Sequence, residues 1–223
     1  MAPIIHTVNL CKVYAVGKER VVALNDVSIS IEKGEFCCIV GQSGSGKSTL
    51  LNQLAGLEKP TRGKVFIGSH EISAMTEDEL AKFRQAHLGF IFQSYNLLPT
   101  MTAAENVALP LMFKGISRSQ RLAMARALLH DSPIYVFDEA TSNVDAESEN
   151  DIMKAIHSLA GKKTVILISH RLANVVDSDC IYVLEAGRIA EQGTHNDLLA
   201  AHGVYSRLYN AQKQLEDLGE VSA

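Results

Sequence analysis

Residues Gly41-Gln-Ser-Gly-Ser-Gly-Lys-Ser48 match the template G-x-x-x-x-G-K-[ST], which is typical of a phosphate-binding loop. The stretch follows a β-rich run, Phe36-Cys-Cys-Ile-Val40, and precedes residues 48–57, which have helical character. Glycines in such a loop let backbone N–H groups close around phosphate oxygens, and the helix that follows directs its positive dipole end at them. An ordinary Gly/Ser turn is the alternative, and the flanking strand and helix argue against it. The stretch therefore predicts a strand, a loop and a helix that bind a nucleoside triphosphate.

The same loop predicts which side chains would hold the ligand. Lys47 adds a mobile positive charge near the β and γ phosphates, and the Ser48 hydroxyl suits a Mg²⁺ position. The nucleotide-binding residues expected from this part of the chain are Gly41, Ser43, Gly44, Ser45, Gly46, Lys47, Ser48 and Thr49.

The composition limits the classes of protein to which the chain can belong. A length of 223 residues suits one α/β domain with a sizeable core. Hydrophobic residues make up 47%, but no run approaches the roughly 18 apolar residues that cross a bilayer. A net charge of −4 gives no support to nucleic-acid binding. The four cysteines fit neither a disulfide framework nor a metal site. Because residues 1–7 also lack a secretory signal, we expect a cytoplasmic location.

The order of apolar runs predicts a mainly parallel sheet preceded by an antiparallel part. Strands are expected at 4–10, 21–31, 88–92, 134–137, 164–168 and 180–185, and a short hairpin at 64–67 and 71–72. Helices are expected at 118–130, 146–159, 171–176 and from about Asn196 onward. A further helix, from Thr76 to about Ala86, begins with the capping-box spacing of Thr76 and Glu79. Apolar strands bounded by helices favour a sheet that is covered on both faces.

Two carboxylates end the apolar run Ile134-Tyr-Val-Phe-Asp138-Glu139. Ligands of open α/β sheets bind at the carboxyl ends of strands, so Asp138 is placed to hold Mg²⁺. Glu139 is placed to orient or deprotonate an attacking water. The alternative is a helix N-cap pair, because Glu139-Ala-Thr-Ser also begins a turn toward a helix.

With these motifs the chain resembles the nucleotide-binding subunit of ATP-binding-cassette (ABC) transporters over nearly its whole length. By this resemblance Tyr14 stacks on adenine, and Gln93 senses Mg²⁺ and water beside the groove for the membrane partner. Ser142-Asn-Val-Asp145 matches the D-loop that crosses to a second subunit, and His170 matches the switch histidine on the γ-phosphate. Taken alone, Tyr14 would as often be a packing residue, and a lone histidine such as His170 would more often be structural.

The resemblance implies a fold, cofactors and partners. We expect an α/β P-loop NTPase core with a mainly parallel sheet flanked by helices, an antiparallel β subdomain and a shortened helical subdomain. The chain would be one nucleotide-binding domain over 1–223, divided into an antiparallel β part at 1–35, a P-loop core at 36–92, a truncated helical part at 93–130, and the second core part with a C-terminal helix at 131–223. It would be an ATPase that uses ATP and Mg²⁺, pairs as an ATP-dependent homodimer and lies peripherally on the inner face of the membrane against transmembrane transporter subunits.

One family motif is missing from this sequence. ABC subunits carry a signature loop, Leu-Ser-Gly-Gly-Gln, before the helix that leads to the second carboxylate strand, but here Phe113-Lys-Gly-Ile-Ser-Arg-Ser-Gln-Arg-Leu122 runs directly into Ala123-Met-Ala-Arg-Ala-Leu128. The segment between Gln93 and Asp138 is also a few tens of residues shorter than is usual in the family. Ser117-Arg-Ser-Gln120 is a candidate degenerate signature, but without glycine its backbone could not approach a phosphate as closely.

The two halves of the chain resemble different branches of the family. Residues up to about Gly115, including Glu105-Asn-Val-Ala-Leu-Pro110, resemble the lipoprotein-release and macrolide-export branch. From about Arg121 onward, Ser169-His-Arg-Leu172 and Glu191-Gln-Gly-Thr-His195 resemble exporters with fused membrane and ATPase domains. The chain therefore has the pattern of a splice of two branches, which either natural divergence or a constructed hybrid would produce.

The missing loop favours ATP binding over turnover, because removing one preorganised donor from a transition-state site typically slows a reaction by about 10²–10³. A nucleotide-binding module with little catalysis is therefore the main alternative to a transporter ATPase of weak activity. A P-loop metabolite kinase is a less favoured alternative, because such an enzyme would need an Arg-bearing lid and an acceptor pocket. The soluble ABC ATPases of translation or DNA repair generally carry paired cassettes or long insertions, whereas this chain has one P-loop.

Overall fold

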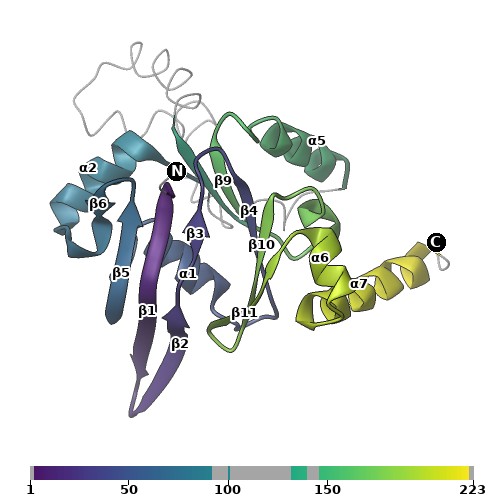
Figure 1. Cartoon of the computed structure of the whole chain (residues 1–223), viewed down its shortest axis with the longest axis horizontal. Helices are drawn as coiled ribbons and strands as arrows, with labels where there is room; N and C mark the ends of the chain where they lie inside the picture. Colours follow the sequence, from purple (N-terminus) through teal and green to yellow (C-terminus); the bar gives the residue numbers. More distant parts are fainter. Residues whose placement is uncertain (1–2, 92–99, 101–131, 140–145, 221–223) are drawn as a thin grey trace.

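A computed structural model describes residues 3–91, 100, 132–139 and 146–220 of the chain (Figure 1). Two sheets make up the body of the molecule, with helices between them and on one outer face. The expected helix at 118–130 and the truncated helical part at 93–130 lie outside the described residues.

The first sheet is antiparallel, as the sequence predicted for the N-terminal part. It contains β1 (Ile5–Val16), β2 (Glu19–Val27), β3 (Ser30–Ile31), β5 (Arg62–Ile67) and β6 (His70–Glu71). The order is β2-β1-β5-β6, and β3 pairs with β1. The expected strand at 21–31 is thus divided into β2 and β3. The predicted hairpin is confirmed, and it joins this sheet rather than the P-loop core.

The second sheet is mainly parallel, which confirms the predicted fold class. It contains β4 (Phe36–Val40), β7 (Leu88–Ile91), β8 (Ile134–Asp138), β9 (Thr164–Ile168), β10 (Cys180–Glu185) and β11 (Arg188–Gly193). The order is β11-β10-β4-β9-β8-β7, in which only β11 runs antiparallel to its neighbour. The sequence analysis missed β11, because this edge strand holds a single strongly apolar residue, Ile189, and is half exposed.

The helices lie where the sequence predicted them, but two of them differ from the prediction in helix type or in continuity. They are α1 (Lys47–Leu54), α2 (Glu77–His87), α5 (Ala146–His157), α6 (His195–Ala200) and α7 (Val204–Glu220), with 3₁₀ turns at Ile72–Ala74 and Leu172–Val175. The predicted capping box of Thr76 and Glu79 is confirmed at the start of α2. The helix expected at 171–176 is a single 3₁₀ turn, and the expected C-terminal helix is divided into α6 and α7.

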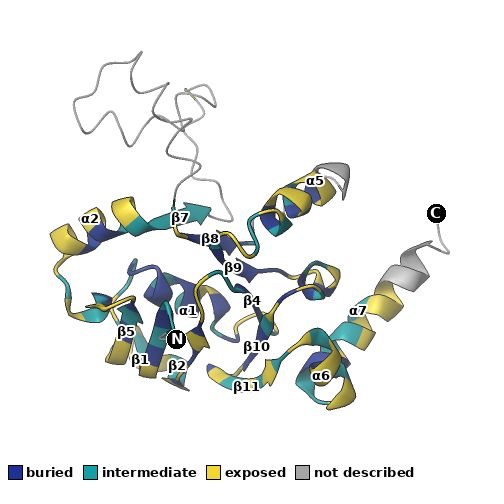
Figure 2. Cartoon of the chain, turned by 45° about the horizontal axis from the view of Figure 1, so that its top comes forward, coloured by how far each residue is buried: buried dark blue, intermediate teal, exposed yellow. Residues whose placement is uncertain are grey.

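The strand β4 is buried on both faces and separates two hydrophobic clusters. Cys37 and Ile39 pack in the cluster between the two sheets, together with the apolar residues of α1. Phe36, Cys38 and Val40 point to the opposite face, which α5, α6 and α7 cover. Figure 2 shows the resulting dark blue centre of the molecule, and residues 213–215 of α7 are exposed. This alternation explains why β4 reads as a continuous apolar run.

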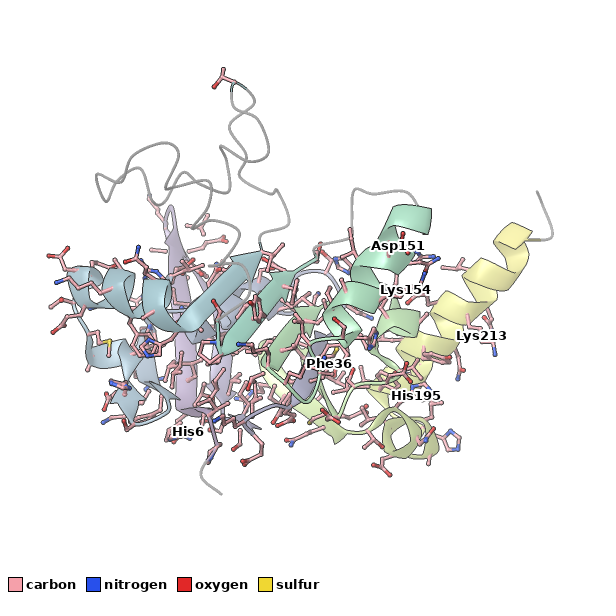
Figure 3. The ribbon with its side chains drawn as sticks, turned by 90° about the horizontal axis from the view of Figure 1, so that it is seen from above. His6, Phe36, Asp151, Lys154, His195 and Lys213 are labelled. Atoms are coloured by element: carbon pink, nitrogen blue, oxygen red, sulfur yellow. The ribbon has the colours of Figure 1, made fainter. Side chains whose placement is uncertain are left out.

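Glu191 of β11 anchors the helix α7 to the second sheet. Its two carboxylate oxygens accept hydrogen bonds from the backbone N–H groups of Val204 and Tyr205, the first two residues of that helix. The Tyr205 ring is fully buried, and its hydroxyl lies 2.7 Å from Nδ1 of His195, which Figure 3 labels near the start of the C-terminal helices. A carboxylate at a helix N-terminus both satisfies unpaired donors and complements the helix dipole.

We expect Glu191→Ala to lower the free energy of unfolding by about 2 kcal/mol, because two backbone donors at the start of α7 lose a charged acceptor. Urea titration followed by circular dichroism measures the change. The matched control is Glu185→Ala, which removes an exposed glutamate from the adjoining strand β10. Equal stabilities of the two variants would contradict this role of Glu191.

Candidate nucleotide-binding site

The carboxyl ends of three neighbouring strands meet at one edge of the parallel sheet. β9 lies between β4 and β8, so the loop after β4, the residues after β8 and the residues after β9 share that edge. The backbone N–H of Glu139 donates to the carbonyl oxygen of Ile168 at 3.1 Å and thereby ties two of these strand ends together. The strand order brings together residues that lie about 100 positions apart in the sequence.

The loop after β4 has a conformation that requires glycine. Gly46 has a φ of 104° and immediately precedes α1, and a Cβ atom there would lie 2.4 Å from the carbonyl oxygen of Ala23. At Gly41 a Cβ would lie 2.2 Å from the carbonyl oxygen of Leu184. The backbone of the loop therefore packs directly against β2 and β10, which fixes its shape before any ligand binds.

Lys47 lies inside this loop, with only 6% of the residue exposed. Its Nζ donates to the carbonyl oxygens of Gly41 and Gln42, each at 2.9 Å. Burial lowers the pKa of the Lys47 ammonium, and the negative charges of Glu139 and Asp138 oppose this effect. The positive charge is thus held at the mouth of the sheet with acidic groups facing it.

A cavity of about 270 Å³ opens between the loop and the ends of β8 and β9. The predicted residues that line it are Ser43, Gly44, Gly46, Lys47, Ser48, Thr49, Glu139 and His170. Val21, Val22 and Ala23 of β2 form another part of the wall. Sequence patterns did not predict these three residues as part of the site, because Val21 and Val22 are typical apolar strand residues and their exposure follows only from the fold.

Glu139 and His170 form a pair on the wall of the cavity opposite the loop. Nε2 of His170 lies 2.5 Å from Oε1 of Glu139, and the Glu139 side chain is 9% exposed whereas that of His170 is 53% exposed. Glu139 has a φ of 49°, a left-handed conformation that residues other than glycine adopt infrequently. Such backbone strain is common at functional sites, where the surrounding structure holds it in place. The structure therefore brings together two residues that the sequence assigned to one reaction.

Asp138 is a buried carboxylate whose Oδ1 has no hydrogen-bond partner among the described residues. Burial raises the pKa of this carboxyl, as does the neighbouring Glu139, while Lys47 and His170 act in the opposite direction. Oδ1 is thus an oxygen with unused acceptor capacity beside the phosphate-binding loop. Mg²⁺ prefers such oxygens and is typically held by one or two carboxylates together with substrate phosphates, so the residues fit the cation.

Comparisons with known proteins agree with this geometry. A family profile described as "ABC transporter" matches residues 24–121. An uncharacterised ABC transporter ATP-binding protein of Thermotoga maritima is 36% identical, over 85% of this chain and 94% of its own length. The chain belongs to the ABC transporter family. It is an ATP-binding cassette with the P-loop NTPase fold and falls in the ABC class of ATPases.

A solved structure supports the cassette fold in addition to the sequence similarity. The dimeric cassette MJ0796, described as a post-hydrolysis state bound to ADP and Pi, has a TM-score of 0.77 to this cassette at 33% identity, covering 85% of this chain and 98% of that one. An uncharacterised ABC transporter ATP-binding protein of Haemophilus influenzae is 35% identical over 90% of this chain, but this chain spans only 41% of that protein. No helix among the described residues is long and apolar enough to span a membrane.

The length of one alignment shows that this cassette lacks some residues of a relative. The match to the Haemophilus influenzae protein extends over 232 positions, yet this chain has 223 residues in all, of which 90% are matched. The relative therefore has residues within the matched region that this cassette lacks. The shortening expected between Gln93 and Asp138 stays a prediction.

Some of the predicted site residues lie outside the described residues or do not line the cavity. Gln93 and the D-loop at 142–145 lie outside the described residues. Gly41 and Ser45 do not line the cavity; the first shapes the loop, and the buried Oγ of the second has no hydrogen-bond partner among the described residues. Tyr14 lies in β1 beside the cavity rather than in its wall, and its hydroxyl donates to Glu58 at 2.7 Å.

We expect Asp138→Asn to stabilise the ligand-free cassette at pH 7. Because burial raises the pKa of this carboxyl in the folded chain, the ionised group favours the unfolded chain increasingly as pH rises above the ordinary value of 3.8. The gain in unfolding free energy should therefore shrink as pH falls toward 4, where the native carboxyl is also uncharged. Denaturant titrations at both pH values, without Mg²⁺ or nucleotide, measure it. Asp177→Asn, at an exposed position, is the control, and a loss of stability at pH 7 specific to Asp138→Asn would contradict the expectation.

Proposed function

We propose that this cassette binds ATP with Mg²⁺ and hydrolyses it to energise a membrane transporter. The observation that carries the proposal is the cavity in which the glycine-shaped loop and Lys47 face the pair of Glu139 and His170. One wall offers main-chain donors and a cation for phosphates, and the other offers a carboxylate and an imidazole for the reaction. Membership of the ABC transporter family supports the same function.

Nucleotide binding would use the loop and the carboxylate at the end of β8. The backbone from Gly41 to Gly46 and the ammonium of Lys47 hold the phosphates, while Ser48 and Asp138 would hold Mg²⁺. The cation supplies positive charge that neutralises the phosphate oxygens as the transferring group separates. The Lys47 ammonium already lies within the loop in the ligand-free chain, so little rearrangement is required before binding.

Hydrolysis would use the pair on the opposite wall. Glu139 polarises a water for in-line attack on the γ-phosphate, and His170 steadies the phosphate oxygens. In the ligand-free chain His170 instead contacts Glu139, so a bound triphosphate would compete for the imidazole. The role of Gln93 beside Mg²⁺ and water stays a prediction from the resemblance.

The partners we propose are transmembrane transporter subunits and a second cassette. The solved relative MJ0796 is described as a dimer in a post-hydrolysis state bound to ADP and Pi. In this chain the absence of a Leu-Ser-Gly-Gly-Gln signature would weaken ATP-dependent pairing, because the partner's loop would contribute fewer N–H groups to the γ-phosphate. With such partners, the cassette would work at the inner face of the cell membrane.

A second candidate function is an ATP-binding module with little or no turnover. The missing signature and the shortened middle favour it, since both affect the half of the site that a partner would complete. The binding half, by contrast, is present in one chain. Affinity and turnover therefore have to be measured separately.

We expect Lys47→Ala to weaken ATP binding at least 100-fold, because it removes a buried cation from the phosphate site. Isothermal titration of the full chain with ATP and Mg²⁺ measures the affinity. Lys33→Ala, which removes an exposed lysine, is the control for net charge, and thermal unfolding of each variant checks folding. Unchanged affinity in folded Lys47→Ala would overturn the phosphate assignment.

We expect Glu139→Gln to retain ATP affinity within about twofold and to lower phosphate release by about 10²-fold or more, because a general base is lost while its shape is kept. If turnover requires a weakly formed pair, mass action makes the rate per cassette rise with protein concentration. A rate per cassette that does not change with protein concentration would contradict a turnover limited by weak pairing. Full binding with equally negligible phosphate release in both proteins would instead favour the binding module.

A further inference from the structure

Tyr14 is held by a cluster of polar side chains next to the cavity, here called the Glu58 cluster: Lys12, Tyr14, Asn52 and Glu58. The Tyr14 hydroxyl donates to Oε2 of Glu58 at 2.7 Å, and Nζ of Lys12 lies 3.1 Å from the same oxygen. The amide of Asn52 donates to the other carboxylate oxygen at 3.4 Å. One carboxylate thus joins β1 to α1 and to the segment after that helix.

Lys12 covers one face of the Tyr14 ring. Its Nζ lies 5.1 Å from the ring centroid and also donates to the carbonyl oxygen of Lys59 at 2.8 Å, and its side chain is only 15% exposed. A cation at this distance is attracted to the ring face and fixes its orientation. No aromatic side chain of the described residues stacks on the other face.

The cluster adjoins the triphosphate cavity through two of its walls. Tyr14 pairs with Val21 across β1 and β2, and directly paired residues of antiparallel strands point to the same face. Val21 lines the cavity. On α1, Asn52 lies one turn after Thr49, which also lines the cavity. The Tyr14 ring therefore lies at the edge of the cavity, away from the part that contains the Lys47 ammonium.

The charge state of the cluster suits a fixed arrangement. Although burial by itself raises the pKa of Glu58, hydrogen bonds from Tyr14 and Lys12 lower it overall, so the carboxylate is stabilised as an anion. Burial and the hydrogen bond to Glu58 raise the pKa of Tyr14, so its hydroxyl remains a donor. Both partners thus keep the protonation state that the hydrogen bond requires.

We propose that Glu58 is a positioning residue that holds the Tyr14 ring, with one face covered by Lys12, so that the other face stacks on the base of a bound nucleotide. The proposal rests on the function proposed above and deepens it at the base end of the site. A ring that is already immobilised loses little conformational freedom when a base binds, and this strengthens stacking. Glu58 acts through Tyr14 and does not touch the phosphates.

A second lysine, glutamate and aromatic ring on the same sheet serve as a control. Lys64 Nζ lies 3.0 Å from Oε2 of Glu71 and 6.0 Å from the ring centroid of Phe66. This group has the same lysine–glutamate ion pair and a cation near an aromatic ring, but Phe66 has no hydroxyl and none of these residues lines the cavity. Glu71→Ala therefore removes an equivalent ion pair without affecting the proposed base contact.

The test compares two ligands, ATP and inorganic tripolyphosphate, each titrated with Mg²⁺ into the full chain by calorimetry. Stacking of a base on an aromatic ring is worth about 5-fold to 150-fold in affinity. We expect Glu58→Ala to weaken ATP binding about fivefold or more and tripolyphosphate binding less than twofold. Glu58→Gln, which still accepts a hydrogen bond from Tyr14, should fall between wild type and Glu58→Ala. Glu71→Ala should change neither affinity.

A double-mutant comparison separates positioning from a general structural role. In a Tyr14→Ala background, Glu58→Ala should have no further effect on ATP affinity, because the ring through which it acts is gone. Equal weakening of both ligands by Glu58→Ala, or an undiminished effect in the Tyr14→Ala background, would overturn the proposal. Thermal unfolding confirms that each variant is folded.

Failure of the proposed function would give a different result. If wild type bound neither ligand, the assignment of the phosphate site would be wrong. The same would follow if Lys47→Ala bound both ligands as tightly as wild type does. In either case the proposal for Glu58 would fall with the phosphate site. If wild type bound both ligands with equal affinity and Lys47→Ala bound neither, the phosphate site would stand and only the base contact would be overturned.

Discussion

The site depends on the close packing of the loop after β4 against its neighbours. Gly41 and Gly46 lie so close to the backbones of β10 and β2 that a single methyl group at either position would collide with a carbonyl oxygen. The Gly187 N–H adds a hydrogen bond of 3.0 Å to the carbonyl of Ser45. The loop is thus rigid because it packs closely against both sheets, and the shape of the loop determines the position of the Lys47 ammonium.

Strand order then determines the chemistry that faces the loop. With β9 between β4 and β8, His170 and Glu139 meet across the ends of adjacent strands and approach Lys47 from the other side of the cavity. The same placement leaves Asp138 buried, with one oxygen that has no partner among the described residues. The positive Lys47 ammonium and the negative carboxylates of Glu139 and Asp138 thus lie close together. A bound phosphate can neutralise the ammonium, and a hard cation can neutralise the carboxylates.

Sequence patterns predicted most of the described fold and failed where local signals are weak. Thr164–Ile168 and Cys180–Glu185 are continuous apolar runs, and both strands were predicted with the correct bounds. The turn at Leu172–Val175 has helical spacing, but it ends after one 3₁₀ turn, where the backbone N–H and hydroxyl of Ser178 both donate to the carbonyl oxygen of Val175. Strand β11 escaped because its pairing with β10, rather than its own hydrophobicity, makes it a strand.

The sequence by itself determined the phosphate-binding loop, the two carboxylates after β8 and the family, because those features reside in contiguous residues whose spacing is fixed by the chain. Only the tertiary structure decided that Glu139 contacts His170, that Val21 and Val22 form a wall of the cavity, and that Glu58 holds Tyr14. These contacts join segments that are separated by tens of residues and belong to different elements of the fold. Their formation depends on strand order and on burial of the shared core, which no local pattern encodes.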